Sequence, residues 1–102
     1  MAGSLNKVML IGHLGADPEI KQMPSGTPMA KLRVATTETW NDRASGQRQE
    51  KTEWHTVIAF DKLASICERY LSKGRLVFVE GAITTRSWDD KETGQKRYMT
   101  EI

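Results

Sequence analysis

Only one segment of this 102-residue chain has a helical pattern, and strand-like segments lie on both sides of it. In residues 61–74, DKLASICERYLSKG, the apolar residues follow helical spacing. Asp61 is predicted to be the N-cap of this helix, and Gly74 the left-handed residue that follows its last turn. The rest of the fold is therefore expected to consist of strands and the turns between them.

Three strand-like segments precede the helix and two follow it. They are residues 5–14, 29–40, 51–60, 75–86 and 98–102. Residues 23–28 are expected to form a turn region, and polar hairpins are predicted to turn at Ser45-Gly46 and at Thr93-Gly94. Gly81 is predicted to form a bulge or a bend in the fourth strand.

The order β-β-β-α-β-β predicts an all-β fold with one helix, namely an OB-fold, a five-stranded Greek-key barrel, here with long β-hairpins. The whole chain, residues 1–102, is expected to be a single domain, since this length is usual for one. Such a barrel binds its ligands on one face, and oligonucleotides and oligosaccharides are its usual ligands. The fold alone does not decide the function.

Residue types that carry catalytic or metal chemistry are scarce. The one cysteine, Cys67, lies in the helical pattern, and the two histidines, His13 and His55, lie in different segments. The sequence shows no nucleophile–base set, no metal-ligand spacing and no phosphate-binding glycine loop. We therefore expect no enzyme activity, no metal and no other cofactor. A net charge of +2 permits a polyanionic partner without requiring one.

The hydropathy pattern predicts a soluble chain. Its mean hydropathy is −0.53, and no apolar run reaches the roughly 20 residues that a membrane span needs. The N-terminus lacks the pattern of a signal peptide. We therefore expect a cytoplasmic protein with no membrane partner.

The three tryptophans, Trp40, Trp54 and Trp88, lie at the ends of the hairpins among polar neighbours. A core tryptophan would be poorly shielded there, whereas exposed aromatic side chains on an OB-fold stack on bases. Taken singly, each tryptophan is also compatible with packing, and strict alternation places Trp40 on the side of Leu32 and Val34. Their grouping on the hairpins favours binding.

Other aromatic residues are divided between the core and the surface. On a strand, Trp54 and Phe60 fall on one face about 20 Å apart, and alternation leaves open whether they face inward or outward. Phe78 lies in an apolar run, and Tyr70 lies on the apolar stripe of the helix. We predict that Phe78 and Tyr70 are core residues.

Basic residues are interleaved with the tryptophans along the hairpins and at the ends of the helix. A groove that follows a nucleic-acid backbone needs such cations beside its stacking platforms. Acidic residues share the same hairpins, so an ordinary solvated surface charge remains the alternative for each cation. The candidates for phosphate contacts are Arg33, Arg43, Lys62, Lys73 and Arg86.

Segments from residue 5 to residue 102 resemble, in order, the signatures of the bacterial single-stranded DNA-binding protein family. These segments are NKVMLIGHLGADPEI, ATTETW, KTEWH, FDKLA, YLSKG, VEGAITTRSW and GQKRYMTE. The resemblance implies a homotetramer of OB-fold subunits, associated with the nucleoid, that binds single-stranded DNA without sequence preference during replication, recombination and repair. It implies that Trp40, Trp54, Phe60 and Trp88 stack on bases and that His55 contributes to subunit contacts. The residues alone leave His55 open between an interface and an ordinary surface group.

In that family the fifth strand runs further and is followed by a flexible linker and an acidic tail, which recruits replication and repair enzymes. This sequence stops at Ile102, which we expect to lie within the fifth strand, so the tail-dependent partners are not expected for it. The alternative hypothesis is a primosomal-type OB-fold assembly module that acts mainly through protein contacts. TEWH and the three tryptophans argue against this alternative.

Overall fold

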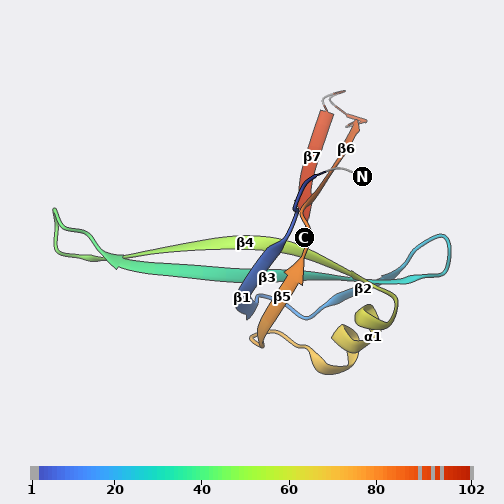
Figure 1. Ribbon diagram of the computed structural model, residues 1–102, viewed down its shortest axis with the longest axis horizontal. Helices are drawn as coiled ribbons and strands as arrows, with labels where there is room; N and C mark the ends of the chain where they lie inside the picture. The colour runs from blue at the N-terminus through green and yellow to red at the C-terminus, as the bar shows by residue number, and fades with distance from the viewer. Residues whose placement is uncertain (1–2, 90, 93, 95, 102) are drawn as a thin grey trace.

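In the computed structural model, residues 3–89, 91–92, 94 and 96–101 are described; for Arg86, Trp88, Asp89 and residues 96–101 this covers the backbone alone. Figure 1 shows the elements, which are β1 (Val8–Leu14), β2 (Glu19–Gln22), β3 (Pro28–Asn41), β4 (Arg48–Phe60), α1 (Asp61–Tyr70), β5 (Leu76–Gly81), β6 (Thr84–Asp89) and β7 (Lys96–Glu101). The described part of the chain thus has strands and a single helix, placed between β4 and β5. It contains no helix that is long and apolar enough to cross a membrane.

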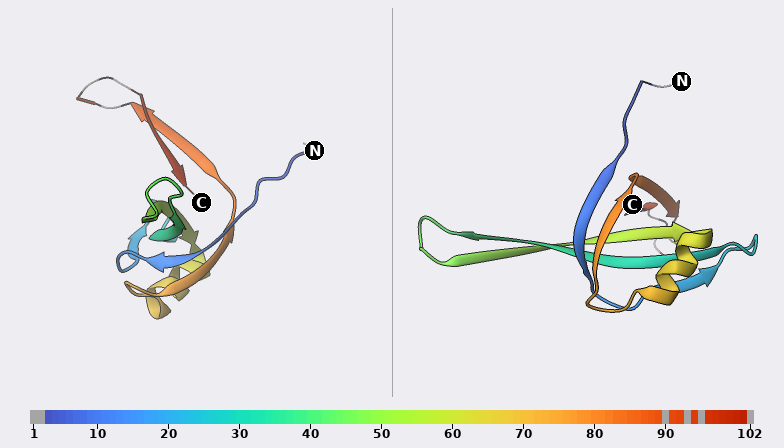
Figure 2. Two further views of the ribbon diagram at one scale, coloured as in Figure 1. Left: turned by 90° about the vertical axis from the view of Figure 1, so that its left-hand side faces the viewer. Right: turned by 60° about the horizontal axis from the view of Figure 1, so that its bottom comes forward.

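The long strand β3 organises a five-stranded antiparallel sheet. β4 pairs with it along its length, from Met29 opposite Phe60 to Asn41 opposite Arg48. On the other edge of β3, β2 pairs with the first residues, and the end of β1 pairs further along. β1 also pairs with β5, so the sheet curves around from β4 to β5 (Figure 2), while β6 and β7 form a separate hairpin.

The core lies between the inner face of this sheet and α1. Alternation along β3 and β4 directs every second side chain inward, with Leu32 opposite Val57 and Ala30 opposite Ala59. Among the residues whose side chains are described, the buried apolar ones are Leu14, Ala30, Leu32, Val34, Val57, Ala59, Ala64 and Cys67. Since α1 contributes only Ala64 and Cys67 to this set, the helix covers one end of the sheet with a narrow stripe.

The β3–β4 hairpin extends well beyond the core as a two-stranded arm (Figure 1). Its loop closes where Asp42 N–H donates to the Gln47 carbonyl oxygen at 2.8 Å and the Asp42 carboxylate accepts from Ala44 N–H and Ser45 Oγ. Gly46 has a φ of +70°, so the predicted Ser45-Gly46 turn is confirmed. The loop is short, because β3 continues to Asn41 and β4 already begins at Arg48, before the predicted start of that strand at residue 51.

The helix is shorter than predicted and is capped differently. It ends at Tyr70 rather than near Gly74, and Leu71 N–H makes the last helical hydrogen bond, to the Cys67 carbonyl oxygen at 3.0 Å. Asp61 is the first helical residue and not the N-cap, because β4 runs directly into α1 and the extended Phe60 occupies that position. Gly74 has the expected left-handed conformation, with φ +89°, but it lies in the turn before β5.

The number and extent of the strands also differ from the prediction in two places. β2 (Glu19–Gln22) is a short strand that the sequence does not predict; it pairs with residues 28–31 of β3, and its one apolar residue, Ile20, packs partly buried against the core. The predicted strand 75–86 is divided into β5 and β6 directly after Gly81, where the chain leaves one sheet for the other. The predicted bend at Gly81 is therefore confirmed.

The predictions that Phe78 and Tyr70 belong to the core are wrong. Phe78 is 61% exposed, because β5 alternates and directs Val77 and Val79 inward instead. Tyr70 is equally exposed, because the buried stripe of α1 runs through Ala64 and Cys67. Both aromatic side chains therefore belong to the surface of the single chain.

Candidate nucleic-acid interface

The outer face of β3 and β4 carries two half-exposed aromatic rings with cations between them. Trp54 and Phe60 lie on this face and are 51% and 47% exposed. Directly across on β3, Arg33 pairs with Thr56, and Lys31 pairs with Ile58. We define the outer strip as the set formed by Lys31, Arg33, Trp54, Ile58 and Phe60. Its rings face outward, which answers the question that the alternation of residues 51–60 leaves open.

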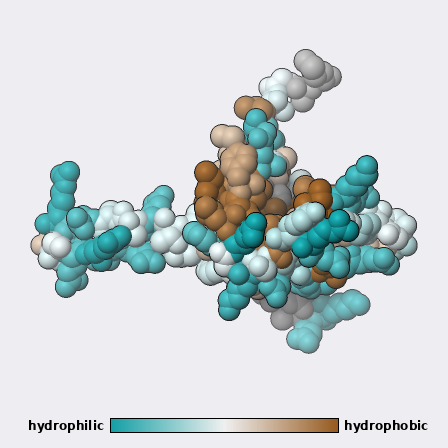
Figure 3. All heavy atoms as spheres, turned by 90° about the horizontal axis from the view of Figure 1, so that it is seen from below, coloured by the Kyte–Doolittle hydropathy of each residue, from teal (hydrophilic) through white to brown (hydrophobic). Residues whose placement is uncertain are grey.

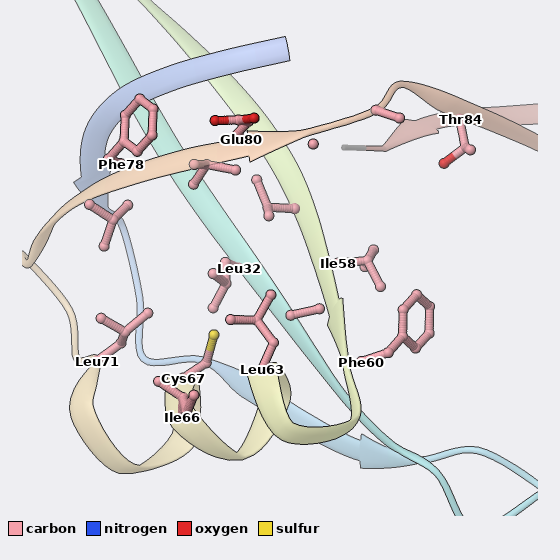
Figure 4. Close-up of a pocket in the computed structure, with 16 residues that line it drawn as sticks. Leu32, Ile58, Phe60, Leu63, Ile66, Cys67, Leu71, Phe78, Glu80 and Thr84 are labelled. Carbon is pink, nitrogen blue, oxygen red and sulfur yellow. The ribbon is translucent and has the colours of Figure 1, made fainter. Parts of the chain in front are cut away.

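Figure 4 shows the geometry that separates the outer strip from the core. Ile58 and Phe60 lie on one side of β4, and Leu32 and Leu63 lie on the other, toward α1. From Ala35 opposite Trp54 to Met29 opposite Phe60, the outward residues include Lys31 and Arg33 but no acidic side chain. On β2, Glu19 lies opposite Lys31 and forms an ion pair with Lys21, so the cations around this stretch (Lys21, Lys31 and Arg33) outnumber its one carboxylate and suit a polyanion.

Lys31 was missed as a candidate when the sequence was considered alone. Its signal was present in the sequence, since Lys31, Arg33 and Ala35 alternate with the apolar Leu32 and Val34. The register then shows what this alternation could not, namely that Lys31 shares its face with Trp54 and Phe60. Lys31 is half-buried between them, whereas Arg33 is exposed.

Arg33 and Trp54 are in direct contact. The Arg33 guanidinium carbon lies over the Trp54 ring, 5.5 Å from its centroid, which is within cation–π range. The two side chains are diagonal neighbours, because Trp54 pairs with Ala35 and Arg33 pairs with Thr56. Two of the predicted site residues are thus brought together.

Trp40 and Arg43 lie on the arm, away from the outer strip. Trp40 is 47% exposed and borders a small hollow with Thr39, Asn41 and Arg48. By register it lies on the opposite side of the two-stranded arm from Trp54, as its alternation with Leu32 and Val34 indicates. It is nevertheless exposed, because the arm extends past the core. Arg43 is exposed in the loop at the tip.

The remaining predicted cations and Trp88 are dispersed over other elements. Lys62 is exposed at the start of α1, and Lys73 is exposed after its end, where its backbone N–H donates to an Asp17 carboxylate oxygen at 2.8 Å. In the backbone register of the β6–β7 hairpin, Arg86 pairs with Met99 and Trp88 pairs with Arg97. The side chains of Arg86 and Trp88 lie outside the described part of the structure.

His55 pairs with Val34 on the inner side of the hairpin and is half-buried. Its Nε2 and the Thr36 hydroxyl oxygen are 2.9 Å apart, a hydrogen bond within the chain. The structure therefore provides His55 with an ordinary polar partner, and its predicted role in subunit contacts stays a prediction.

An apolar groove of about 640 Å³ lies between α1, β4 and β5 (Figure 4). Glu80 is the only charged residue among the described residues that line it, so the groove does not suit a polyanion. Cys67 lines this groove, and burial raises the pKa of its thiol. The described residues contain no group of three or more His, Cys, Asp or Glu side chains that would hold a metal ion.

A second surface is apolar rather than basic. The outward side chains of β1 and β5 include Met9, Ile11, Leu76 and Phe78, all of them mostly exposed, and the register places Ile11 opposite Phe78. These four residues are called the β1–β5 patch. Figure 3 shows apolar side chains gathered over β1 and β5, in contrast with the hydrophilic arm. Apolar side chains grouped in this way are typical of a protein–protein contact.

Comparisons with known proteins bear on the family and the fold of the chain. The model of the single-strand binding protein family matches residues 5–102. A single-stranded DNA-binding protein of Rhizobium meliloti (strain 1021) is 55% identical over 103 residues, covering 100% of this chain and 59% of the relative. The chain thus spans less than two thirds of the length of that relative. A solved structure described as Plasmodium falciparum SSB complex with ssDNA matches with a TM-score of 0.85 and 40% identity, covering 100% of this chain and 88% of that one. The predicted OB-fold class is confirmed.

Proposed function

Because the chain belongs to the single-strand binding protein family, we propose that it binds single-stranded DNA without sequence preference. Membership of this family also confirms that it is not an enzyme. The Rhizobium relative is named for single-stranded DNA binding, and the Plasmodium neighbour was solved with single-stranded DNA. Both support the same ligand for this chain.

The outer strip is the observation that carries the proposal. Its half-exposed rings, Trp54 and Phe60, suit stacking on bases, which tolerates any sequence because every base has a π-face. Lys31 and Arg33 lie between the rings and suit phosphates. Trp40 and Trp88 on the hairpins, and Arg43, Lys62, Lys73 and Arg86, extend the proposed path beyond the strip.

The experiment that tests this function is a titration of intrinsic tryptophan fluorescence with oligo-dT, at low and at high salt. A duplex of the same length serves as the control. Single-strand binding is expected to quench the fluorescence strongly, and the affinity is expected to fall as salt rises, since part of the binding free energy comes from counterion release. The duplex is expected to quench weakly or not at all.

An equal response to duplex and single strand would refute the proposal, and so would no binding of oligo-dT at any salt. An affinity for oligo-dT that does not change with salt would refute the assigned role of the cations in binding phosphates. In the case of no binding, a pull-down of protein partners would test the assembly-module alternative.

We also propose that the chain assembles as a homotetramer and that the β1–β5 patch is part of its subunit contacts. Outward Ile11 and Phe78 lie opposite each other, with Met9 and Leu76 diagonal to them and the exposed Glu80 and His13 at the two ends, so the centre of the patch offers an apolar surface to another copy. A contact of the β1–β5 patch with a second patch would remove this surface from water. His55 is proposed to contribute to the same assembly.

The proposed setting is the cytoplasm, in association with the nucleoid, during replication, recombination and repair. Coating of exposed single strands in all three processes requires binding that ignores sequence, which stacking on Trp54 and Phe60 provides.

A further inference from the structure

The indole of Trp54 lies against the backbone of Gly15, in the connection between β1 and β2. A methyl group on the Gly15 Cα would lie 2.6 Å from Cη2 of Trp54 and closer still to Cζ3. Real Cβ atoms essentially never approach other atoms within 3.0 Å, so any side chain at this position displaces the ring. Gly15 is not among the glycines with positive φ, and its backbone therefore does not itself require glycine.

The backbone holds Gly15 in this place. Its N–H donates to the Arg33 carbonyl oxygen at 2.9 Å, and Leu14, next to it, pairs with Val34. The residue that carries the guanidinium over Trp54 thus also anchors the glycine beneath the edge of the same ring. Ala35, directly opposite Trp54, is small and leaves the indole room to reach across β3.

The indole is therefore confined before any ligand binds. The Gly15 backbone contacts its outer edge, the Arg33 guanidinium lies over the ring, and about half of the side chain stays exposed. An aromatic side chain that is already ordered loses less freedom when a base stacks on it. Such preorganisation raises affinity by roughly 2- to 10-fold per side chain.

We propose that Gly15 and Arg33 are positioning residues that hold the Trp54 indole in the orientation that accepts a base. This inference rests on the proposed function and changes one assignment within it, because it gives Arg33 a role through Trp54 in place of the phosphate contact. The two roles differ in their salt dependence. A lost phosphate contact lowers the salt slope of the binding constant by about 0.7 for single strands, whereas a misplaced ring leaves the slope unchanged.

The experiment uses Arg33→Gln, Arg33→Lys and Gly15→Ala, with Gly3→Ala as the matched control, since a methyl group at Gly3 meets nothing within 4 Å. Affinity for labelled oligo-dT is measured by anisotropy at several salt concentrations. Each variant is made both in the parent chain and together with Trp54→Ala. The free protein is examined separately by Trp54 emission and acrylamide quenching in a chain whose other two tryptophans are replaced by phenylalanine.

We expect Arg33→Gln to weaken binding about 2- to 5-fold with an unchanged salt slope, as loss of an exposed cation–π contact would. Arg33→Lys, which keeps the positive charge, is expected to weaken binding less than Arg33→Gln does. Gly15→Ala is expected to weaken binding about tenfold, which is within the range for one lost stacking contact. Both effects are expected to vanish in the Trp54→Ala background, and both variants are expected to change Trp54 emission in the free protein.

The proposal is refuted if Arg33→Gln lowers the salt slope and costs the same affinity with and without Trp54. It is also refuted if Gly15→Ala leaves both emission and affinity at the level of Gly3→Ala. If Gly15→Ala does not fold by circular dichroism, Arg33→Gln decides the question through the same two readouts. If the parent chain does not bind oligo-dT, the proposed function has failed, while Trp54 emission and quenching in the free protein still decide whether Gly15 and Arg33 hold the ring.

Discussion

Replacing Phe78 by alanine is expected to weaken self-association without unfolding the chain. Full burial of a side chain of this kind contributes about 1.5–3 kcal/mol. Phe78 is 61% exposed in the single chain, so an interface that buries this exposed part would gain about 1–2 kcal/mol per copy. A two-fold contact uses the residue twice, and its loss then costs about 2–4 kcal/mol, or roughly 30- to 700-fold in the dissociation constant of the contact.

Sedimentation equilibrium of parent and variant over a range of concentrations measures this change. Leu63→Ala is the matched control, because Leu63 is similarly exposed but lies on α1, outside the β1–β5 patch. Circular dichroism and urea unfolding show whether the Phe78→Ala subunit keeps its fold. A dissociation constant within twofold of the parent value, or a weakening equal to that of Leu63→Ala, would show that this patch is not a subunit contact.

Four further outcomes are expected. Trp54→Ala should cost about 1–3 kcal/mol of oligo-dT binding while the chain stays folded by circular dichroism, and equal binding in the titration would contradict its stacking role. Lys31→Gln should lower the salt slope of that binding by about 0.7, and a slope equal to the parent's would remove Lys31 from the phosphate path. Leu32→Ala should destabilise the chain by about 2–5 kcal/mol in urea, since Leu32 is buried; a loss below 1 kcal/mol would contradict this. Because burial keeps the pKa of the Cys67 thiol raised, this group should resist a thiol reagent at pH 8 until urea unfolds the chain, and rapid labelling of the native protein would show otherwise.

The sequence predicts those parts of the fold that are determined by strong local patterns. The long alternation in residues 29–40, the Ser45-Gly46 turn and the single helical period all reappear in the structure, with boundaries shifted by a few residues. The sequence does not predict β2, because Glu19–Gln22 is only four residues long with the single apolar Ile20, and its strand structure depends on pairing with β3. A segment whose structure depends on a partner strand carries no periodic signal of its own.

The candidate site was predicted in its residue types more than in its arrangement. Alternation places Trp54 and Phe60 on one face, but only the register with β3 adds Lys31 and Arg33 between them. The contact of Trp54 with Gly15 depends on how β1 leaves the sheet, which no local pattern encodes. Contacts between segments that lie far apart in the sequence require the folded topology.

Phe78 shows why an apolar run does not identify a core residue. In the run LVFV of β5, alternation sends Val77 and Val79 toward the core and leaves Leu76 and Phe78 outside. A strand that is apolar on both faces is ordinarily covered on both faces, as in sheets flanked by other layers. Here α1 and the core residues of the sheet cover only the face of β5 that carries Val77 and Val79. The opposite face stays exposed in the single chain. The apolar run of β5 therefore does not place Phe78 in the core. It indicates instead that the outer face of this strand is an apolar surface, which another molecule can cover. The proposed subunit contact would cover this surface, whereas the single chain leaves Phe78 exposed.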